Sequence, residues 1–123
     1  MDLRHKRRIT IAQNLYALSF HTKKDSKKFL NDLDEKTKKI IKQKSKIHKS
    51  IEKYASKFPI DNIAKIDLAI LELSIYELLF EKKEPPKVII DEGIELAKEM
   101  GGDRSFAFIN AILGKVFKEK YGK

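Results

Sequence analysis

The 123-residue sequence contains no cysteine, which excludes a disulfide framework and a thiolate metal site. Its apolar runs are all much shorter than the roughly 20 residues that a membrane-spanning helix needs. No apolar signal-peptide core follows the basic N-terminus. The sequence therefore predicts a cytoplasmic protein, folded as a single domain over residues 1–123 that is long enough to enclose a hydrophobic core.

Motifs that carry catalysis or hold cofactors are also missing. The sequence has no glycine-rich phosphate-binding loop of standard spacing and no zinc-protease helix motif. His5, His21 and His48 have no carboxylate at metal-ligand spacing on the same helix face. The acidic residues between 91 and 99 are typical of a solvated, lysine-paired helix face. We therefore expect no enzyme activity, no metal ion and no cofactor.

Positive charge is abundant and unevenly distributed, with a net charge of +9. Residues 1–58 contain 17 Lys or Arg against 6 Asp or Glu, a balance of +11, whereas residues 59–123 contain 10 against 12, a balance of −2. A basic excess attracts phosphate groups or anionic lipid. Much of the excess is lysine, so a lysine-rich source proteome is an alternative explanation.

The segment RHKRRITIAQNLY, residues 4–16, combines a basic cluster with the apolar spacing of a helix. Asp2 is a suitable N-cap for that helix, and Tyr16 is expected in the core with its hydroxyl at the rim. Cations in a first helical turn oppose the helix dipole by about 0.3–1 kcal/mol each. We interpret the cluster as compensated by an anionic ligand, although solvated side chains would also explain it.

The remaining spacing predicts further helices with short connections. We expect Gly93 to allow a close packing contact. Phe106 and Phe108 cannot share a helix face, so one of the two rings is peripheral. The sum is an all-α fold of about seven helices. The further helices are expected after Asp25 or Ser26, over residues 35–58 up to Pro59, over 67–81, from Pro85-Pro86 to Met100, and after a cap at Asp103.

Two long segments carry a family resemblance. IDLAILELSIYELLF and EPPKVIIDEGIELAKEMGGDRSFAFINAIL, together with the opening RRITIAQNLY, resemble the NusB family of transcription antitermination factors. The resemblance implies two packed, perpendicular helical bundles. It also implies binding of boxA-type single-stranded RNA together with the ribosomal protein NusE, within an RNA polymerase antitermination complex, and a possible homodimer when that partner is absent.

The resemblance also assigns candidate site residues by matching position. Departures from the family pattern include Glu72, where many members have Arg, and Arg104, where an acidic residue is common. The implied RNA-binding residues are Arg4, His5, Lys6, Arg7, Arg8, Gln13, Tyr16, Arg104, Ser105 and Phe108, and the implied partner-binding residues are Asp67, Glu72, Tyr76 and Glu77.

Two other functions remain open from the sequence. The same fold precedes ribosomal RNA cytosine methyltransferase domains, so the chain could be an accessory domain of such an enzyme, although it contains no catalytic domain. A generic helical interaction protein or homodimer, with incidental positive charge, is the second alternative.

Overall fold

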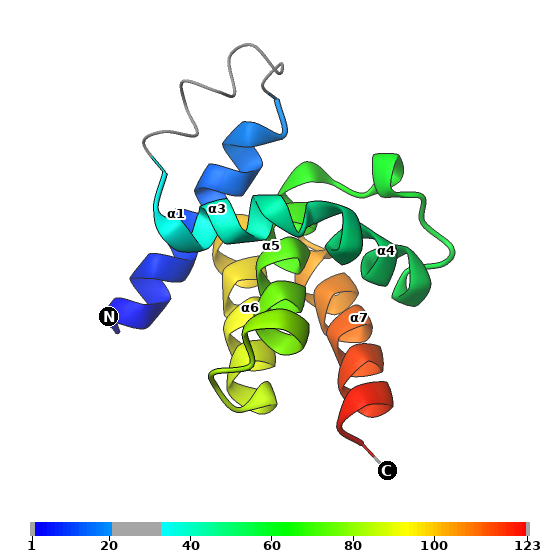
Figure 1. Cartoon of the computed structure of the whole chain (residues 1–123). Coiled ribbons are helices and arrows are strands. Elements are labelled where there is room, and N and C mark those ends of the chain that lie inside the picture. The colour runs from blue at the N-terminus through cyan, green and yellow to red at the C-terminus, as the bar shows by residue number, and fades with distance from the viewer. Residues whose placement is uncertain (1, 21–32, 123) are drawn as a thin grey trace.

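The computed structural model describes residues 2–20 and 33–122. Within these ranges the chain is all-helical, as expected, and contains six α-helices rather than about seven, as well as two short helical segments (Figure 1). The helix expected after Asp25 or Ser26 lies outside the described residues. The α-helices are α1 (Leu3–Leu18), α3 (Glu35–Lys42), α4 (Lys44–Tyr54), α5 (Lys65–Ile75), α6 (Pro86–Met100) and α7 (Ser105–Lys120); η1 (Ile60–Asn62) is a 3₁₀ turn and η2 (Tyr76–Glu81) a π-helical turn.

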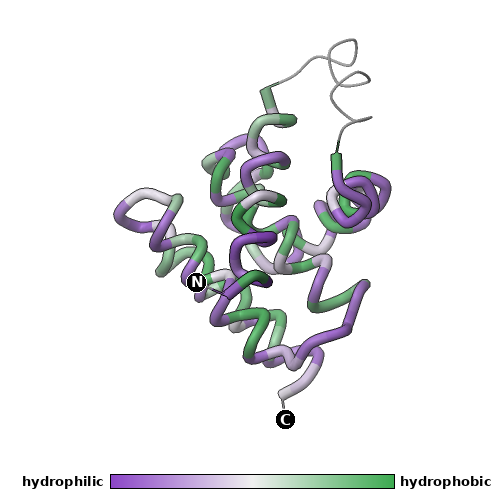
Figure 2. Tube along the Cα trace, turned by 90° about the vertical axis from the view of Figure 1, so that its left-hand side faces the viewer, coloured by the Kyte–Doolittle hydropathy of each residue, from purple (hydrophilic) through white to green (hydrophobic). Residues whose placement is uncertain are grey.

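Helix α5 forms the centre of the fold. It contacts α1, α4, α6 and α7, and its side chains are buried without interruption from Ala69 to Ile75. A helix that is apolar on nearly every side is stable in water only when other helices surround it. The outer helices alternate apolar and polar residues along their length (Figure 2). No helix of the described residues is both long and apolar enough to span a bilayer.

The single helix predicted over residues 35–58 is wrong, because the structure divides it at Gln43 into α3 and α4. Helix α4 then ends at Tyr54, well before Pro59, and Phe58 is exposed. Ile40 and Ile47 are nonetheless both buried on either side of the break. The apolar spacing therefore continued through the break and concealed it.

The helix predicted over residues 67–81 also differs from the structure. Helix α5 begins at Lys65, and its last part is the π-helical turn η2, which is wider than an α-helical turn. Lys82 closes this turn in the left-handed region, with φ of 53°, and its N–H donates to the Glu77 carbonyl at 2.9 Å. The turn ends α5 and directs the chain toward Pro85.

The predicted helix caps are partly confirmed. The Asp2 carboxylate accepts a hydrogen bond from the Arg4 backbone N–H at 3.0 Å, as expected of an N-cap. The predicted cap at Asp103 is wrong, because Arg104 precedes α7. The buried Ser105 hydroxyl instead accepts a hydrogen bond from the Gly102 N–H at 2.9 Å, which stabilises the turn before the helix.

The close contact expected at Gly93 is confirmed. A Cβ atom there would lie 2.8 Å from Ser74 Oγ and 2.9 Å from Leu113 Cδ1. Both distances are shorter than a normal van der Waals contact. The absence of a side chain at Gly93 therefore lets α6 approach both α5 and α7.

We expect Gly93→Ala to destabilise the fold by about 1–2 kcal/mol, because overpacking outweighs the gain in helix propensity. Gly114→Ala is the matched control, since nothing lies within 4 Å of an added Cβ in that helix. This control should stabilise the protein by about 0.5–1 kcal/mol. Urea unfolding followed by circular dichroism measures both free energies, and equal stabilities of the two variants would contradict the packing argument.

Candidate nucleic-acid interface

The basic residues at the start of α1 fall into two groups that face in different directions. His5 and Arg8 are buried, whereas Arg4, Lys6 and Arg7 are exposed. Residues three apart lie on the same side of a helix, so His5 and Arg8 share the face that α1 turns toward α5 and α6. Only the second group is available to a ligand in solution.

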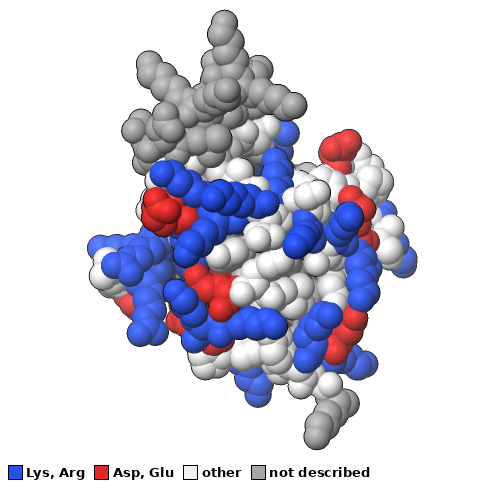
Figure 3. Space-filling model, in the orientation of Figure 1, with Lys and Arg blue, Asp and Glu red and all other residues white. Residues whose placement is uncertain are grey.

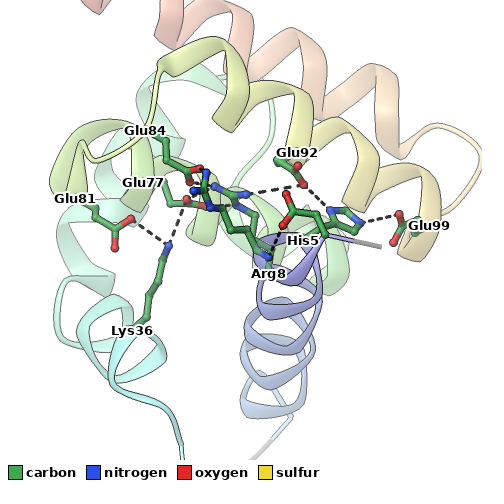
Figure 4. A network of polar contacts seen from close by, with 10 residues as sticks. His5, Arg8, Lys36, Glu77, Glu81, Glu84, Glu92 and Glu99 are labelled. Atoms are coloured by element: carbon green, nitrogen blue, oxygen red, sulfur yellow. Dashed lines mark hydrogen bonds and ion pairs between the residues drawn. The ribbon is translucent and has the colours of Figure 1, made fainter.

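Arg8 forms the most buried ion pair of the described residues. Its Nε and Nη2 donate to the two carboxylate oxygens of Glu77 at 2.9 and 2.8 Å, and the two side chains are only 5% and 2% exposed. Arg8 also donates to Glu84, and its Nη1 lies 3.9 Å from Glu92 (Figure 4). Burial opposes the guanidinium charge, but Glu77, Glu84 and Glu92 outweigh it and raise the pKa of Arg8.

Lys36 joins the same network from α3. Its ammonium group lies 3.3 Å from Glu77 and 3.1 Å from Glu81, both in η2 (Figure 4). The π-helical turn thus places two carboxylates beside cations from α1 and α3. These pairs connect α1, α3 and η2 at one point of the fold.

His5 lies between two glutamates of α6. Its Nε2 is 2.7 Å from Glu99 Oε1, and its Nδ1 forms a short hydrogen bond with Glu92. The sequence prediction that this acidic face is solvated and paired with lysine is correct for Glu95, which pairs with Lys98 at 3.8 Å, but wrong for Glu92 and Glu99. Their partner lies 87 and 94 residues away in the sequence, so no local spacing could indicate it.

The interpretation that only an external anion compensates these cations is therefore wrong for His5 and Arg8, because the protein's own carboxylates neutralise both. Arg4 contacts Glu84 at 3.4 Å, but its side chain is 71% exposed. Lys6 and Arg7 form no ion pair with any of the described residues. The unpaired positive charge of α1 is thus limited to its outer face.

A groove of about 980 Å³ runs beside this outer face. The exposed apolar side chains Leu3 and Val88 lie along it. On the face drawn in Figure 3, lysine and arginine side chains extend over α1 and across α3 and α4. Charged residues of both signs line the groove, with six cations and four carboxylates: Arg4, Lys6, Arg7, Arg8, Lys36 and Lys83, and Asp34, Glu35, Glu81 and Glu84.

The other residues assigned to RNA by the resemblance have mixed positions. Gln13 and Arg104 are exposed, and Ser105 is buried. Phe108 is half-buried, with its ring centroid 5.4 Å from that of Phe58, so the peripheral ring of α7 is Phe106, which is 46% exposed.

The prediction that Tyr16 belongs to the core is wrong. Its side chain is exposed, and its ring contacts that of Phe20 at a centroid distance of 5.0 Å. Tyr16 lies near the end of α1, where the helix extends past the buried Ala12 and Leu15. At the end of a helix, a residue with the spacing of the apolar face can therefore lie beyond the helices that would bury it.

The four residues that the resemblance assigns to a partner surface are all buried. The carboxylate of Glu72 accepts a hydrogen bond from His48 Nε2 at 2.6 Å, and the ring of Tyr76 stacks on that of Phe80. Glu77 belongs to the Arg8 network. Their exposures are 8% for Asp67, 6% for Glu72, 7% for Tyr76 and 2% for Glu77. In the monomer, therefore, these side chains contact the chain itself.

Fold and surface together define a class of protein: a small all-helical protein that presents a basic helix face and has no set of three His, Asp or Glu side chains suited to a metal ion among its described residues. The comparison with known sequences is more specific. The chain belongs to the NusB family, whose sequence model matches residues 5–118.

Two curated relatives and one solved structure illustrate the match. The transcription antitermination protein NusB of Agathobacter rectalis is 35% identical over 127 residues, which cover 91% of this chain and 97% of that protein. The Clostridium tetani protein of the same name is 48% identical over 84 residues, but the match covers 68% of this chain and only 55% of that relative. The structure of T. maritima NusB superposes with a TM-score of 0.84 at 32% identity, covering 96% of this chain and 92% of that one.

The buried ion pair predicts a large effect of a small substitution. Glu77→Gln keeps the size of the side chain but leaves the Arg8 guanidinium without its bidentate carboxylate. We expect a loss of about 3 kcal/mol in the free energy of unfolding, because the buried Arg8 charge loses its bidentate partner and Lys36 loses one of its two carboxylates. The matched control is Glu95→Gln on the exposed face of α6, which should change stability by less than about 0.5 kcal/mol. Urea denaturation measures both, and a small effect at Glu77 would show that the pair is dispensable.

Proposed function

We propose that this chain is a cytoplasmic RNA-binding transcription antitermination factor that binds boxA-type single-stranded RNA together with the ribosomal protein NusE. Its curated relatives are named transcription antitermination proteins. The structural observation that carries the proposal is the exposed, unpaired charge of Lys6 and Arg7, on a helix whose buried cations are neutralised internally. Such a surface suits a polyanion, because phosphates neutralise cations that the protein leaves unpaired.

The residues of α1 have two different roles in this proposal. Arg4, Lys6 and Arg7 contact the phosphates of the RNA backbone. His5 and Arg8, although the resemblance places them at the RNA, hold the helix that carries those cations. Gln13 is exposed on the same helix and can donate to RNA, whereas Tyr16 offers an exposed ring.

The start of α7 supplies the proposed base contacts. Arg104 is exposed and adds charge, and the buried Ser105 shapes the turn before the helix. Stacking of an unpaired base on an aromatic ring contributes about 1–3 kcal/mol. Phe108 is the ring that the resemblance indicates, and the more exposed Phe106 lies two residues away on another face.

The contact with NusE, the division of the helices into two bundles and a homodimer without the partner rest on family membership. The partner surface would depend only indirectly on four buried side chains that hold α5 and η2 in place, namely those of Asp67, Glu72, Tyr76 and Glu77. We therefore expect the direct contacts with NusE to come from exposed residues beside them.

Isothermal titration calorimetry with a boxA-type RNA tests the proposal. We expect the double variant Lys6→Ala plus Arg7→Ala to bind at least about tenfold more weakly, because two charge-assisted phosphate contacts are lost. The slope of log K against log salt concentration should become shallower by about 1.4, because each single-strand phosphate contact contributes about 0.7 to it.

The charge-matched control is Lys118→Ala plus Lys120→Ala. These exposed lysines lie in the last turn of α7, near the C-terminus and well apart from the start of α1 (Figure 1). This variant should retain nearly the affinity of the unmodified chain. Equal losses in the two double variants would mean that binding depends on net charge alone, and the absence of binding to the RNA with or without purified NusE would refute the proposed function.

A further inference from the structure

The first two turns of α1 have an unusual anchor. Leu3 is 61% exposed, and the first buried apolar side chain of the helix is Ile11. The first turn contains no acidic residue, so the Asp2 cap is the only carboxylate at this end of the helix that complements the dipole within the described residues. Between Asp2 and Thr10, only His5 and Arg8 are fully buried. Ile9 is half-buried against the core. Ion pairs are therefore the main attachment of the segment that displays Arg4, Lys6 and Arg7.

His5 differs from Arg8 in that its charge can be removed near neutral pH. Both of its ring nitrogens face a carboxylate: Nε2 faces Glu99 and Nδ1 faces Glu92. A neutral imidazole has a single N–H donor, and only the imidazolium donates from both nitrogens. The geometry thus favours the protonated ring, because the neutral ring would direct a lone pair at one of the two carboxylates.

Among the described residues, no cation other than His5 pairs with Glu99, and only Arg8 also lies near Glu92. From α6, Glu92 and Glu99 face the ring, and Lys98 of the same helix pairs with Glu95. From α1, Arg8 lies 3.9 Å from Glu92, but Glu77 and Glu84 occupy most of its donors. Loss of the His5 charge would leave Glu99 without a partner.

We propose that His5 is a positioning residue, whose protonated ring clamps the first turns of α1 to α6 and thereby fixes the exposed cations Arg4, Lys6 and Arg7 for RNA, and whose deprotonation releases them. The effect on RNA affinity rests on the proposed RNA-binding function, whereas the attachment of α1 to α6 by His5 does not. It makes RNA affinity depend on pH through a group that does not contact the RNA.

The direction of the pH effect follows from the surroundings of the ring. Burial lowers the pKa of His5, but hydrogen bonds and charge from Glu92 and Glu99 outweigh it and raise the pKa above the usual 6.5. A raised pKa in the folded state means that the clamp stabilises fully below the unfolded pKa of about 6.5. This stabilisation is then lost as the pH rises through the folded pKa.

Three substitutions separate the clamp from general effects. His5→Gln removes the charge at every pH. His5→Arg keeps a permanent charge with several donors, so it preserves the clamp but cannot titrate. His48→Gln is the matched control, because His48 pairs with the single carboxylate of Glu72, between α4 and α5. NMR gives the imidazole titrations and the amide exchange of residues 3–8, and calorimetry gives RNA affinity at pH 6.5 and pH 8.5.

We expect the unmodified chain and His48→Gln to lose about three- to tenfold in RNA affinity between these pH values, as the ordered first turn becomes less populated. His5→Arg should bind with little change between the same pH values, and His5→Gln should bind weakly at both. Amide exchange of residues 3–8 should accelerate with the titration of His5, beyond the acceleration that base catalysis causes in His5→Arg.

The outcomes distinguish the two proposals. A His5 pKa at or below 6.5, or amide exchange in the first turns of α1 that does not follow that titration, would overturn the clamp. RNA binding with the same pH profile in His5→Arg as in the unmodified chain would overturn the positioning role. A clamp confirmed by NMR in a chain that binds no boxA-type RNA would instead refute the proposed function and leave the clamp standing.

Discussion

The buried bidentate pair between Arg8 and Glu77 is the interaction on which the position of α1 depends. Removing a charge from water costs several kcal/mol, and only a well-placed opposite charge offsets that cost. Glu77 meets this condition because the π-helical turn at the end of α5 directs its carboxylate toward α1, where Arg8 reaches both oxygens. Lys36 and Glu84 then complete the compensation on either side.

This pairing gives one short basic segment two functions. Positions 5 and 8 face inward and attach the helix, whereas positions 4, 6 and 7 face outward and keep their charge available. The inward pair uses ionic contacts where most helices use apolar ones. The outer surface of the first turns of α1 can therefore be strongly cationic while ion pairs provide most of the attachment, and that attachment responds to protonation.

Much of the fold was predictable because burial follows helical periodicity. Of the apolar residues spaced along 35–58, Ile40, Ile47, Ile51 and Tyr54 are buried and Phe58 is exposed. The segment 69–75, apolar apart from Glu72 and Ser74, is central. The limits of the helices were less predictable. The break at Gln43 leaves the stripe in phase, and the π-helical turn after Ile75 has no signature in residue type, so both follow from contacts with neighbouring helices.

By itself, the sequence determined the all-helical class, the basic N-terminal half and the NusB family, because composition, spacing and motifs are properties of neighbouring residues. Only the tertiary structure decided which cations remain free. The partners of His5 and Arg8 lie about 70 to 95 residues away, and a carboxylate neutralises a cation only when folding brings the two within a few ångströms. Lys6 and Arg7 differ from His5 and Arg8 in the side of α1 on which they lie. The packing of α1 against α5 and α6 decides which side is buried.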